Sequence, residues 1–167
     1  IIILDDHSTD KSREVIELYR SNPAISHIIY NEENSGSPFK QWKKGIQLAK
    51  HSWVWIAESD DHCTATFLET GNKQLELYPA AGLFYCDAAI GDESSISLKG
   101  NTVGKTFAEE KNQYFKTGKW SADYYISGME EISYCLGIRC TINNASSVLM
   151  KKELLTECID ETARFQF

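Results

Sequence analysis

The sequence predicts an α/β domain in which a mostly parallel sheet is flanked by helices. Short apolar runs alternate with helical patterns through roughly the first 87 residues, and two of these runs end in paired acids. Strands that alternate with helices form βαβ units, whose strands are parallel. A chain of 167 residues with 42% hydrophobic side chains is long enough to bury one sizeable core, so a single domain is expected.

The first elements follow from local patterns. Residues 1–4 are a continuous, mainly β-branched apolar run, as in a strand buried on both faces. Residues 8–10 supply Ser, Thr and Asp as N-cap candidates for a helix, whose apolar spacing ends at Asn22-Pro23. Residues 27–30 form a second short strand, and the turn-rich segment 31–36 follows it.

The alternation continues along the chain. Apolar residues between Phe39 and Ala49 lie on one helical face, and residues 53–57 form a third strand. A helix at 67–77 and a fourth strand at 82–86 complete the pattern. Strands and helices are therefore predicted to alternate throughout the first half of the chain.

The second half is less regular. Residues 88–118 show no clear periodicity and are rich in Gly, Ser, Asn and Lys, so we expect a flexible or substrate-facing segment. Residues 120–136 have a helical pattern with aromatic residues on one side. A strand at 145–150 and the start of a helix at 151–158 are predicted after it.

Composition excludes several classes of protein. The net charge of -7 and the scattered basic residues argue against a nucleic-acid partner, which would need a basic stripe. No run approaches the ~20 apolar residues of a membrane span, and no signal-peptide pattern opens the chain. We expect a cytoplasmic location, with the inner face of the membrane left open as the site of the acceptor. The five cysteines lack zinc-site spacing and are expected to be buried, reduced thiols.

The paired acids are the strongest functional signal. Asp5 and Asp6 follow the first strand, and Asp60 and Asp61 follow the third. In open parallel sheets, ligands bind outside the carboxyl ends of the strands, so these four acids should face one crevice. Grouped carboxylates repel one another unless a cation compensates them, and a divalent metal bound to phosphate oxygens would do so. The alternative is that one pair caps a helix and the other forms a solvated turn.

Three motifs resemble those of family 2 glycosyltransferases. Residues 5–10, Asp-Asp-His-Ser-Thr-Asp, resemble the family's DDGSTD signature, with His7 in place of the usual Gly. Residues 31–36 resemble its N-x-x-N-x-G turn. Residues 53–61 resemble the strand that leads into its Asp-x-Asp metal motif. Their order and spacing fit the family as well.

The resemblance implies a GT-A fold, which is Rossmann-like, and an inverting reaction. Residues 1–87 would form the nucleotide-sugar-binding half, and residues 88–167 an incomplete acceptor-side half. By the same resemblance, Asp6 would contact the nucleotide base, Asp60 the ribose, and Asp61 the metal-bound diphosphate. Mn²⁺ or Mg²⁺ is the implied cofactor, with Asp61 and then Asp60 as its ligands.

Further site residues are expected from the same resemblance. Lys43 and Lys44 fall where relatives place a basic residue near the diphosphate, although a solvated helix face would also explain them. Asp87 follows the fourth strand and is an acceptor-side candidate, with an exposed strand cap as the alternative. Asn144 belongs to a segment that resembles the strand lining the acceptor pocket. The donor-binding set is Asp5, Asp6, Lys43, Lys44, Asp60 and Asp61.

The implied activity is sugar transfer from a nucleotide diphosphate donor to an acceptor hydroxyl, in bacterial cell-surface polysaccharide synthesis. A UDP-sugar is the first guess for the donor, and a saccharide or lipid-linked molecule for the acceptor. The catalytic base is expected beyond Phe167, with Asp160 and Glu161 disfavoured, so the chain by itself is expected to be inactive. The family's first strand would lie upstream of Ile1, so we expect either a homodimer formed by strand exchange or further residues upstream that complete the sheet.

Two other functions stay open at this stage. A catalytically inactive sugar- or partner-binding module could keep the same fold. A metal-dependent nucleotidyltransferase also uses acids at strand ends, but it would need a Gly-rich basic phosphate loop, which the sequence lacks. Metal-dependent binding of a nucleotide diphosphate would separate a glycosyltransferase from a protein-interaction module.

Overall fold

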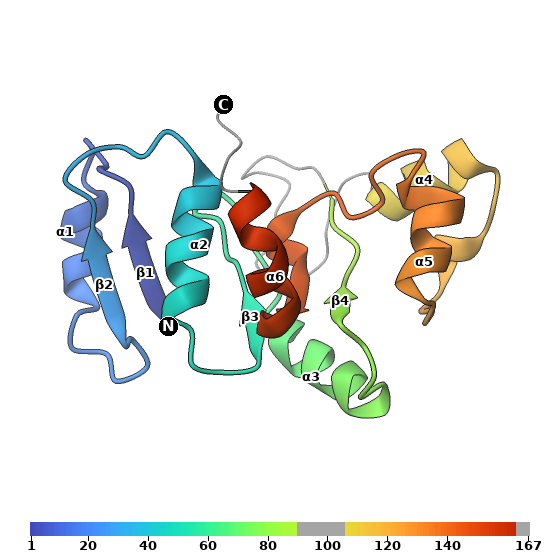
Figure 1. Ribbon diagram of the computed structural model, residues 1–167, viewed down its shortest axis with the longest axis horizontal. Coiled ribbons are helices and arrows are strands. Elements are labelled where there is room, and N and C mark those ends of the chain that lie inside the picture. The colour runs from blue at the N-terminus through green and yellow to red at the C-terminus, as the bar shows by residue number, and fades with distance from the viewer. Residues whose placement is uncertain (90–105, 163–167) are drawn as a thin grey trace. The chain divides into compact units, whose positions relative to one another are not determined.

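A computed structural model describes residues 1–89 and 106–162 and shows an α/β fold (Figure 1). The described strands are β1 (Ile2–Asp5), β2 (His27–Tyr30), β3 (Trp53–Trp55), β4 (Leu83–Tyr85) and β5 (Val148–Lys151). The described α-helices are α1 (Ser12–Leu18), α2 (Pro38–Leu48), α3 (Phe67–Leu77), α4 (Phe107–Phe115), α5 (Gly128–Glu131) and α6 (Lys152–Thr162). Within these two ranges, no helix is long and apolar enough to span a bilayer.

Contacts between residues divide the chain into two units. One unit comprises Ile1–Val54 and Met150–Phe167, and the other comprises Trp55–Leu149. These contact boundaries do not follow residue 87, where the sequence analysis separated a donor half from an acceptor half. That functional division stays a prediction, and each unit is described below by itself.

The first unit is built around two parallel strands. β1 and β2 pair in parallel from Ile2 opposite His27 to Asp5 opposite Tyr30. Pro38 occupies the first turn of α2, where its fixed φ suits a helix and its missing N–H costs nothing. α2 contacts both β1 and α6, and Ile46 of α2 is only 2% exposed. The core of this unit therefore lies between the strands and α2.

A second sheet has the strand order β3-β5-β4. The backbone N–H of Lys152, after β5, donates to the carbonyl of Ser52, before β3 (2.8 Å). The Trp55 indole donates to the carbonyl of Ser146, before β5 (2.9 Å). The end of one strand thus lies beside the start of the other, and β5 runs antiparallel to β3.

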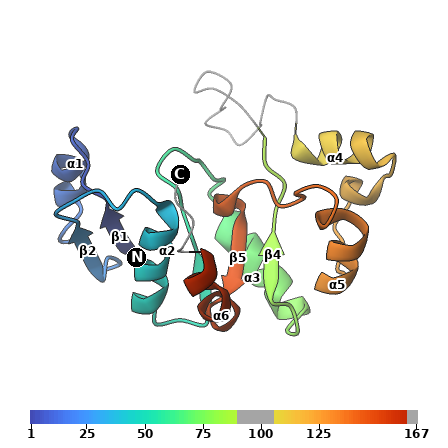
Figure 2. The same cartoon turned by 45° about the horizontal axis from the view of Figure 1, so that its top comes forward.

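The antiparallel β5 corrects part of the sequence-based expectation. The alternation of strands and helices predicted a mostly parallel sheet, but the antiparallel β5 lies between β3 and β4. Figure 2 shows β5 beside β4. Alternation along the chain predicts only the crossovers between successive strands, and it does not detect a distant strand inserted between them. The parallel prediction is confirmed for β1 and β2.

Helix α3 packs closely on the strands of the second unit. A Cβ added at Gly71 would lie 2.5 Å from Cδ1 of Leu149 in β5 and 3.3 Å from Cε1 of Phe84 in β4. Phe67, at the start of α3, is 5% exposed and packs against the ring of Trp55 at 5.2 Å. Gly71 therefore allows the helix to approach the sheet.

In the second half, the structure contains one helix that was not predicted and divides another that was. Within residues 88–118, the described part contains α4, which starts with a capping box between Thr106 and Glu109. That box was the sequence signal for a helix that lacks strong apolar periodicity. Residues 120–136 do not form one helix, because Ser127 and Glu130 make a second capping box that starts α5. The rest of the expected segment, residues 90–105, lies outside the described residues.

Smaller differences concern the cysteines and the last strand. All five cysteines are free thiols, as expected, but Cys63, Cys140 and Cys158 are exposed instead of buried. The strand predicted from residue 145 begins at Val148, because residues 145–147 form a short 3-10 turn.

Candidate functional site

The turn after β1 carries the first pair of acids. Asp5 is 4% exposed, and its carboxylate accepts hydrogen bonds from Nε of Arg13 (3.0 Å) and from the backbone N–H of Ser8 (3.3 Å). His7 has a φ of 65°, in the left-handed region that glycine adopts most easily. The backbone of this turn therefore has the conformation that the family's glycine would supply.

The Asp6 carboxylate joins this turn to the loop at 31–36 and to α2. Its Oδ1 accepts hydrogen bonds from the side-chain amides of Asn31 (2.6 Å) and Gln41 (2.8 Å) and from the backbone N–H of Ser35 (2.9 Å). Its Oδ2 accepts one from the hydroxyl of Ser35 (2.7 Å). The Asn34 side chain also donates to the Asp6 carbonyl (3.0 Å). Asp6 therefore holds two sequence motifs together.

These hydrogen bonds outweigh the effect of burial on both acids. Burial raises the pKa of Asp6, but hydrogen bonds from Ser35 and Asn31 and the charge of Lys44 hold it below its ordinary value. Burial likewise raises the pKa of Asp5, and hydrogen bonds from Ser8 and Arg13 bring it below the ordinary value. Both groups are carboxylates at neutral pH.

The two lysines predicted to bind the donor have different partners. Nζ of Lys44 donates to Oδ1 of Asn31 (2.5 Å), and the amide of Asn31 donates to Asp6, so Asn31 links Lys44 to Asp6. Nζ of Lys43 forms an ion pair with Asp160 of α6 (2.6 Å). Lys44 is therefore the lysine that the structure connects to the Asp6 network.

The second pair of acids lies in a turn after β3, and residues before β5 hold this turn. The backbone N–H of Asp61 donates to the carbonyl of Glu58 (3.3 Å). The Ser146 hydroxyl accepts from the backbone N–H of Glu58 (2.9 Å), and the Asn144 amide donates to Oδ1 of Asp61 (2.9 Å). Two side chains more than 80 residues away in sequence thus fix the position of the acids.

This turn suits a divalent cation that shares its ligands with a substrate. Oδ1 of Asp61 is held by Asn144, while Asp60 is exposed and has no hydrogen-bond partner in the ranges that the structure describes. Over those same ranges, no group of three or more His, Cys, Asp or Glu side chains could hold a metal. Mg²⁺ commonly takes one or two carboxylates together with substrate phosphates, so two aspartates fit this kind of site.

The two acceptor-side candidates line one narrow crevice in the second unit, which has no room for a water molecule. Asp87 and Asn144 both lie at its edge, with Tyr85, Lys111, Thr141 and Ser147 among the other lining residues. Oδ1 of Asp87 accepts a hydrogen bond from the backbone N–H of Ala108 in the first turn of α4 (2.8 Å). Asp87 is thus in part a helix cap.

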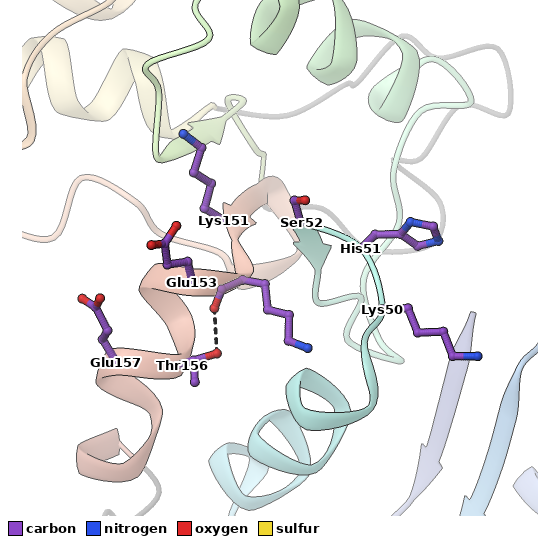
Figure 3. A pocket seen from close by; sticks show the side chains of 8 residues that line it. Lys50, His51, Ser52, Lys151, Glu153, Thr156 and Glu157 are labelled. Carbon is purple, nitrogen blue, oxygen red and sulfur yellow. Dashed lines mark hydrogen bonds between the residues drawn. The ribbon is translucent and has the colours of Figure 1, made fainter.

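Another pocket lies elsewhere and contains none of the predicted site residues. It has a volume of about 690 Å³ and is lined by Lys50, His51, Ser52, Lys151, Lys152, Glu153, Thr156 and Glu157 (Figure 3). His51 and Ser52 precede β3, whereas Asp60 and Asp61 follow it, so this pocket is at the wrong end of the strand for the donor. Its lysine side chains diverge instead of meeting at one point.

The predicted site residues fall into both units. Asp5, Asp6, Lys43 and Lys44 belong to the first unit, and Asp60, Asp61, Asp87 and Asn144 belong to the second. Within the units, the structure connects Asp6 with Lys44 through Asn31, and it joins Asp61 to Asn144 directly. The sequence analysis gave no role to Gln41, Ser146 or Lys111. The Asn-Asn-Ala-Ser-Ser segment could have pointed to Ser146 as a site residue. No sequence pattern pointed to Lys111.

An α/β fold in which strands lead into carboxylates is common among enzymes that bind ligands at the carboxyl ends of their strands. The model of the family described as glycosyl transferase family 2 matches residues 1–145. The chain therefore belongs to glycosyltransferase family 2, and the GT-A fold predicted for it is the fold of that family.

Several curated proteins are similar to parts of the chain. TuaG of Bacillus subtilis (strain 168), whose name assigns it to teichuronic acid biosynthesis, is 37% identical over 46% of this chain. The glycosyltransferase GlyG of Streptococcus pneumoniae is 28% identical over 66%, and the abequosyltransferase RfbV of Salmonella typhimurium is 27% identical over 92%. The chain spans only 29, 36 and 43% of the length of these relatives, respectively. No solved structure matches the chain significantly.

Proposed function

We propose that this protein transfers a sugar from a nucleotide diphosphate donor to an acceptor hydroxyl during the assembly of a bacterial cell-surface polysaccharide. Family membership supports glycosyl transfer, and the names of TuaG and RfbV support this class of product. A UDP-sugar is the proposed donor, and a saccharide or lipid-linked molecule is the proposed acceptor. The proposed location is the cytoplasmic side of the membrane.

The observation that carries this proposal is the acid turn after β3. Asn144 fixes one oxygen of Asp61, and in the described part of the chain its other oxygen and the exposed Asp60 carboxylate have no hydrogen-bond partner. We infer that these oxygens bind Mn²⁺ or Mg²⁺ together with the donor diphosphate. A divalent cation there would stabilise the negative charge that develops on the departing nucleotide diphosphate.

Asp6 has a different role in this proposal. Its carboxylate accepts four hydrogen bonds within the protein, so its main task is to fix the loop at 31–36 and the start of α2. Contact with the nucleotide base would fall to Oδ2, which accepts one hydrogen bond, from Ser35. Lys44, tied to the same network through Asn31, is the proposed cation near the diphosphate.

Transfer would proceed by one displacement. The acceptor oxygen bonds to the anomeric carbon of the donor sugar while the bond from that carbon to the diphosphate oxygen breaks. The acceptor proton would pass to a carboxylate base, and Asp60 and Asp61 would hold the cation that stabilises the leaving diphosphate. Attack opposite the leaving group inverts the anomeric configuration.

Calorimetry would test the donor site. UDP is titrated into the protein with Mn²⁺ and then with EDTA, and the Asp60→Ala/Asp61→Ala variant is measured beside it. We expect Mn²⁺-dependent binding that the double variant weakens at least 10-fold, because it removes the ligands that bridge protein and diphosphate. Glu76→Ala/Asp123→Ala is the matched control, since it removes two exposed acids elsewhere in the same unit. Equal UDP affinity in the presence of EDTA would contradict the proposed site.

A further inference from the structure

Residues 140–143 form an irregular segment that leads to Asn144. They belong to no helix or strand, and in the ranges that the structure describes no hydrogen bond between backbone groups involves them. Thr141 of this segment is nevertheless completely buried, at 0% exposure. Buried backbone groups need hydrogen-bond partners, so side chains must hold this segment in place.

Charged side chains hold Thr141 at its carbonyl and at its hydroxyl. Nζ of Lys111 in α4 donates a hydrogen bond to the Thr141 carbonyl (3.0 Å). The Thr141 hydroxyl donates to Oε1 of Glu131, the last residue of α5 (2.8 Å). Oε2 of Glu131 forms an ion pair with Lys119, which starts the short 3-10 helix Lys119–Ser121. Thr141 is therefore anchored to α4 and α5 directly and to the 3-10 helix through Glu131.

The two charged groups that contact Thr141 are themselves buried. Lys111 is 4% exposed and Glu131 is 7% exposed. Removing charges from water is unfavourable, and replacing a buried ion network by apolar side chains often leaves a protein at least as stable. Burial accordingly lowers the pKa of Lys111, although the carboxylates of Asp87 and Glu131 oppose the shift. Hydrogen bonds to charged groups are shorter and stronger than neutral ones, so this network fixes the position of Thr141 more tightly than apolar contacts would.

Thr141 is three residues before Asn144, which holds the acid turn. The side-chain amide of Asn144 donates to Oδ1 of Asp61 (2.9 Å), and its own Oδ1 accepts from the backbone N–H of Ser146 (2.6 Å). Ser146 thus fixes the Asn144 amide from the β5 side, and Thr141 fixes the chain on the other side. Because groups that support a binding site must be placed within about 0.5 Å, a displaced Thr141 would misplace the Asn144 amide relative to Asp61.

We propose that Lys111 is a positioning residue for the acid turn, because its hydrogen bond to the Thr141 carbonyl sets where Asn144 lies. Asn144 in turn orients Asp61. This inference rests on the proposed function, since it concerns the divalent cation proposed for Asp60 and Asp61. Lys111 itself contacts neither the cation nor a sugar, which agrees with its burial beside a crevice that has no room for a water molecule.

Calorimetry of UDP binding with Mn²⁺ and with EDTA tests this role. Lys111→Met removes the ammonium group and keeps the length of the side chain. We expect it to weaken Mn²⁺-dependent UDP binding about 5–10-fold, which is less than the effect of Asn144→Ala, because Lys111 acts one step further from the cation. The affinity that remains in EDTA should not change, because Asp6 and Lys44, the proposed contacts of the nucleotide, belong to the other unit.

A double-mutant cycle shows whether Lys111 acts through Asn144. If the two residues belong to one chain of contacts, the second substitution has little left to remove. We therefore expect Lys111→Met to change the UDP affinity by less than about twofold in the Asn144→Ala background. A general loss of stability would instead weaken binding by the same factor in both backgrounds.

Further variants separate positioning from folding. Lys116→Met is the matched control, because it removes an exposed lysine just after the same helix, and it should leave the UDP affinity unchanged. Thr141→Val removes the hydroxyl that donates to Glu131 and should also weaken Mn²⁺-dependent binding, whereas Thr141→Ser keeps the hydroxyl and should restore it. If Lys111→Met fails to fold, the same cycle with Asn144→Ala is run with Thr141→Val.

The outcomes separate this inference from the proposed function. Unchanged UDP affinity in Lys111→Met, or losses that add in the double variant, would overturn the positioning role while Mn²⁺-dependent UDP binding by the wild type stands. A wild type that does not bind UDP with Mn²⁺ would instead remove the proposed function itself.

Discussion

At the scale of single residues, the site depends on side chains that complete their hydrogen bonds inside the protein. Asp6 accepts four hydrogen bonds within the protein, and Asp5 accepts at least two. The main effect of these acids is therefore to hold the surrounding loops in place, and direct contact with a ligand is secondary. Asp61 differs, because only one of its oxygens is held within the described structure. The second acid pair is therefore the better candidate for direct contact with metal and diphosphate.

His7 provides a test of the strain in the first motif. Its φ of 65° is unfavourable for a residue with a Cβ and costs about 1–2 kcal/mol. Glycine avoids this strain, but it also makes the unfolded chain more flexible, which offsets part of the gain in stability. We expect His7→Gly to raise the free energy of unfolding by about 0.5–1 kcal/mol in urea denaturation. The control is His51→Gly, at an exposed position without positive φ, which should lower the free energy of unfolding slightly. If His7→Gly also lowers the free energy of unfolding, the His7 side chain makes a stabilising contact.

Asn144 provides a second test at this scale. Its amide fixes Asp61, and its Oδ1 also accepts a hydrogen bond from the backbone N–H of Ser146 (2.6 Å). We expect Asn144→Ala to weaken Mn²⁺-dependent UDP binding by about 10–100-fold, as is usual when a group that orients a metal ligand is removed. Asn143→Ala, at the exposed neighbouring position, is the control for calorimetry. Equal losses in the two variants would mean that Asn144 does not act through Asp61.

At the scale of elements, β5 determines the second half of the site. The segment before it supplies Asn144 and Ser146, which anchor the acid turn after β3. The same segment carries Ser147, whose carbonyl accepts from the backbone N–H of Cys86 after β4 (3.0 Å). One strand thus positions the ends of two others, and it supports both the acid turn and the segment that carries Asp87.

The contact between α3 and the sheet can be tested at Gly71. Alanine is favoured over glycine in a helix by about 1 kcal/mol, but the added Cβ would lie 2.5 Å from buried Leu149. We expect the cost of overpacking to exceed the gain in helix propensity, so that Gly71→Ala lowers the free energy of unfolding by about 1–2 kcal/mol. Gly128→Ala, in the first turn of α5, meets no atom within 4 Å and should change stability little. A stabilised Gly71→Ala would show that Leu149 can move aside.

At the scale of the whole molecule, the acids connect stability with pH. The pKa values of Asp5 and Asp6 lie below their ordinary value of 3.8 in the folded protein, so folding favours the charged forms. Their contribution to stability is therefore complete above about pH 4–5 and is lost as the pH falls through the folded-state pKa values. The pKa values of Asp10 and Glu17 are lowered as well, by hydrogen bonds from Ser12 to Asp10 and from Arg20 and Tyr30 to Glu17.

Chemical denaturation at several pH values measures this effect. We expect the free energy of unfolding of the wild type to fall steeply below about pH 4, and Asp6→Asn to be less stable at pH 7 but to show a shallower fall. Glu76→Gln, at an exposed position, is the control and should keep the wild-type slope. An unchanged slope in Asp6→Asn would show that Asp6 does not dominate the acid sensitivity.

Much of the fold was predictable because it depends on local pattern. The helix at 67–77 and the strand at 27–30 have the predicted bounds, and β1, α2 and β4 lie within a residue or two of them. The signature after β1 could be recognised even with His7 in place of glycine. The helix starts after Thr106 and Ser127 were not predicted. Each is marked only by a short capping box, and the apolar periodicity around it is weak.

The sequence by itself determined the family, the alternation of strands and helices, and the acids at the ends of two strands, because each depends on residues that are close in the chain. Only the tertiary structure decided that β5 enters antiparallel between β3 and β4, that Asn144 and Ser146 hold the acid turn, and that Lys111 is buried beside Asp87. These features join residues 24 to 100 positions apart, whose proximity arises from packing and leaves no periodic trace in the sequence.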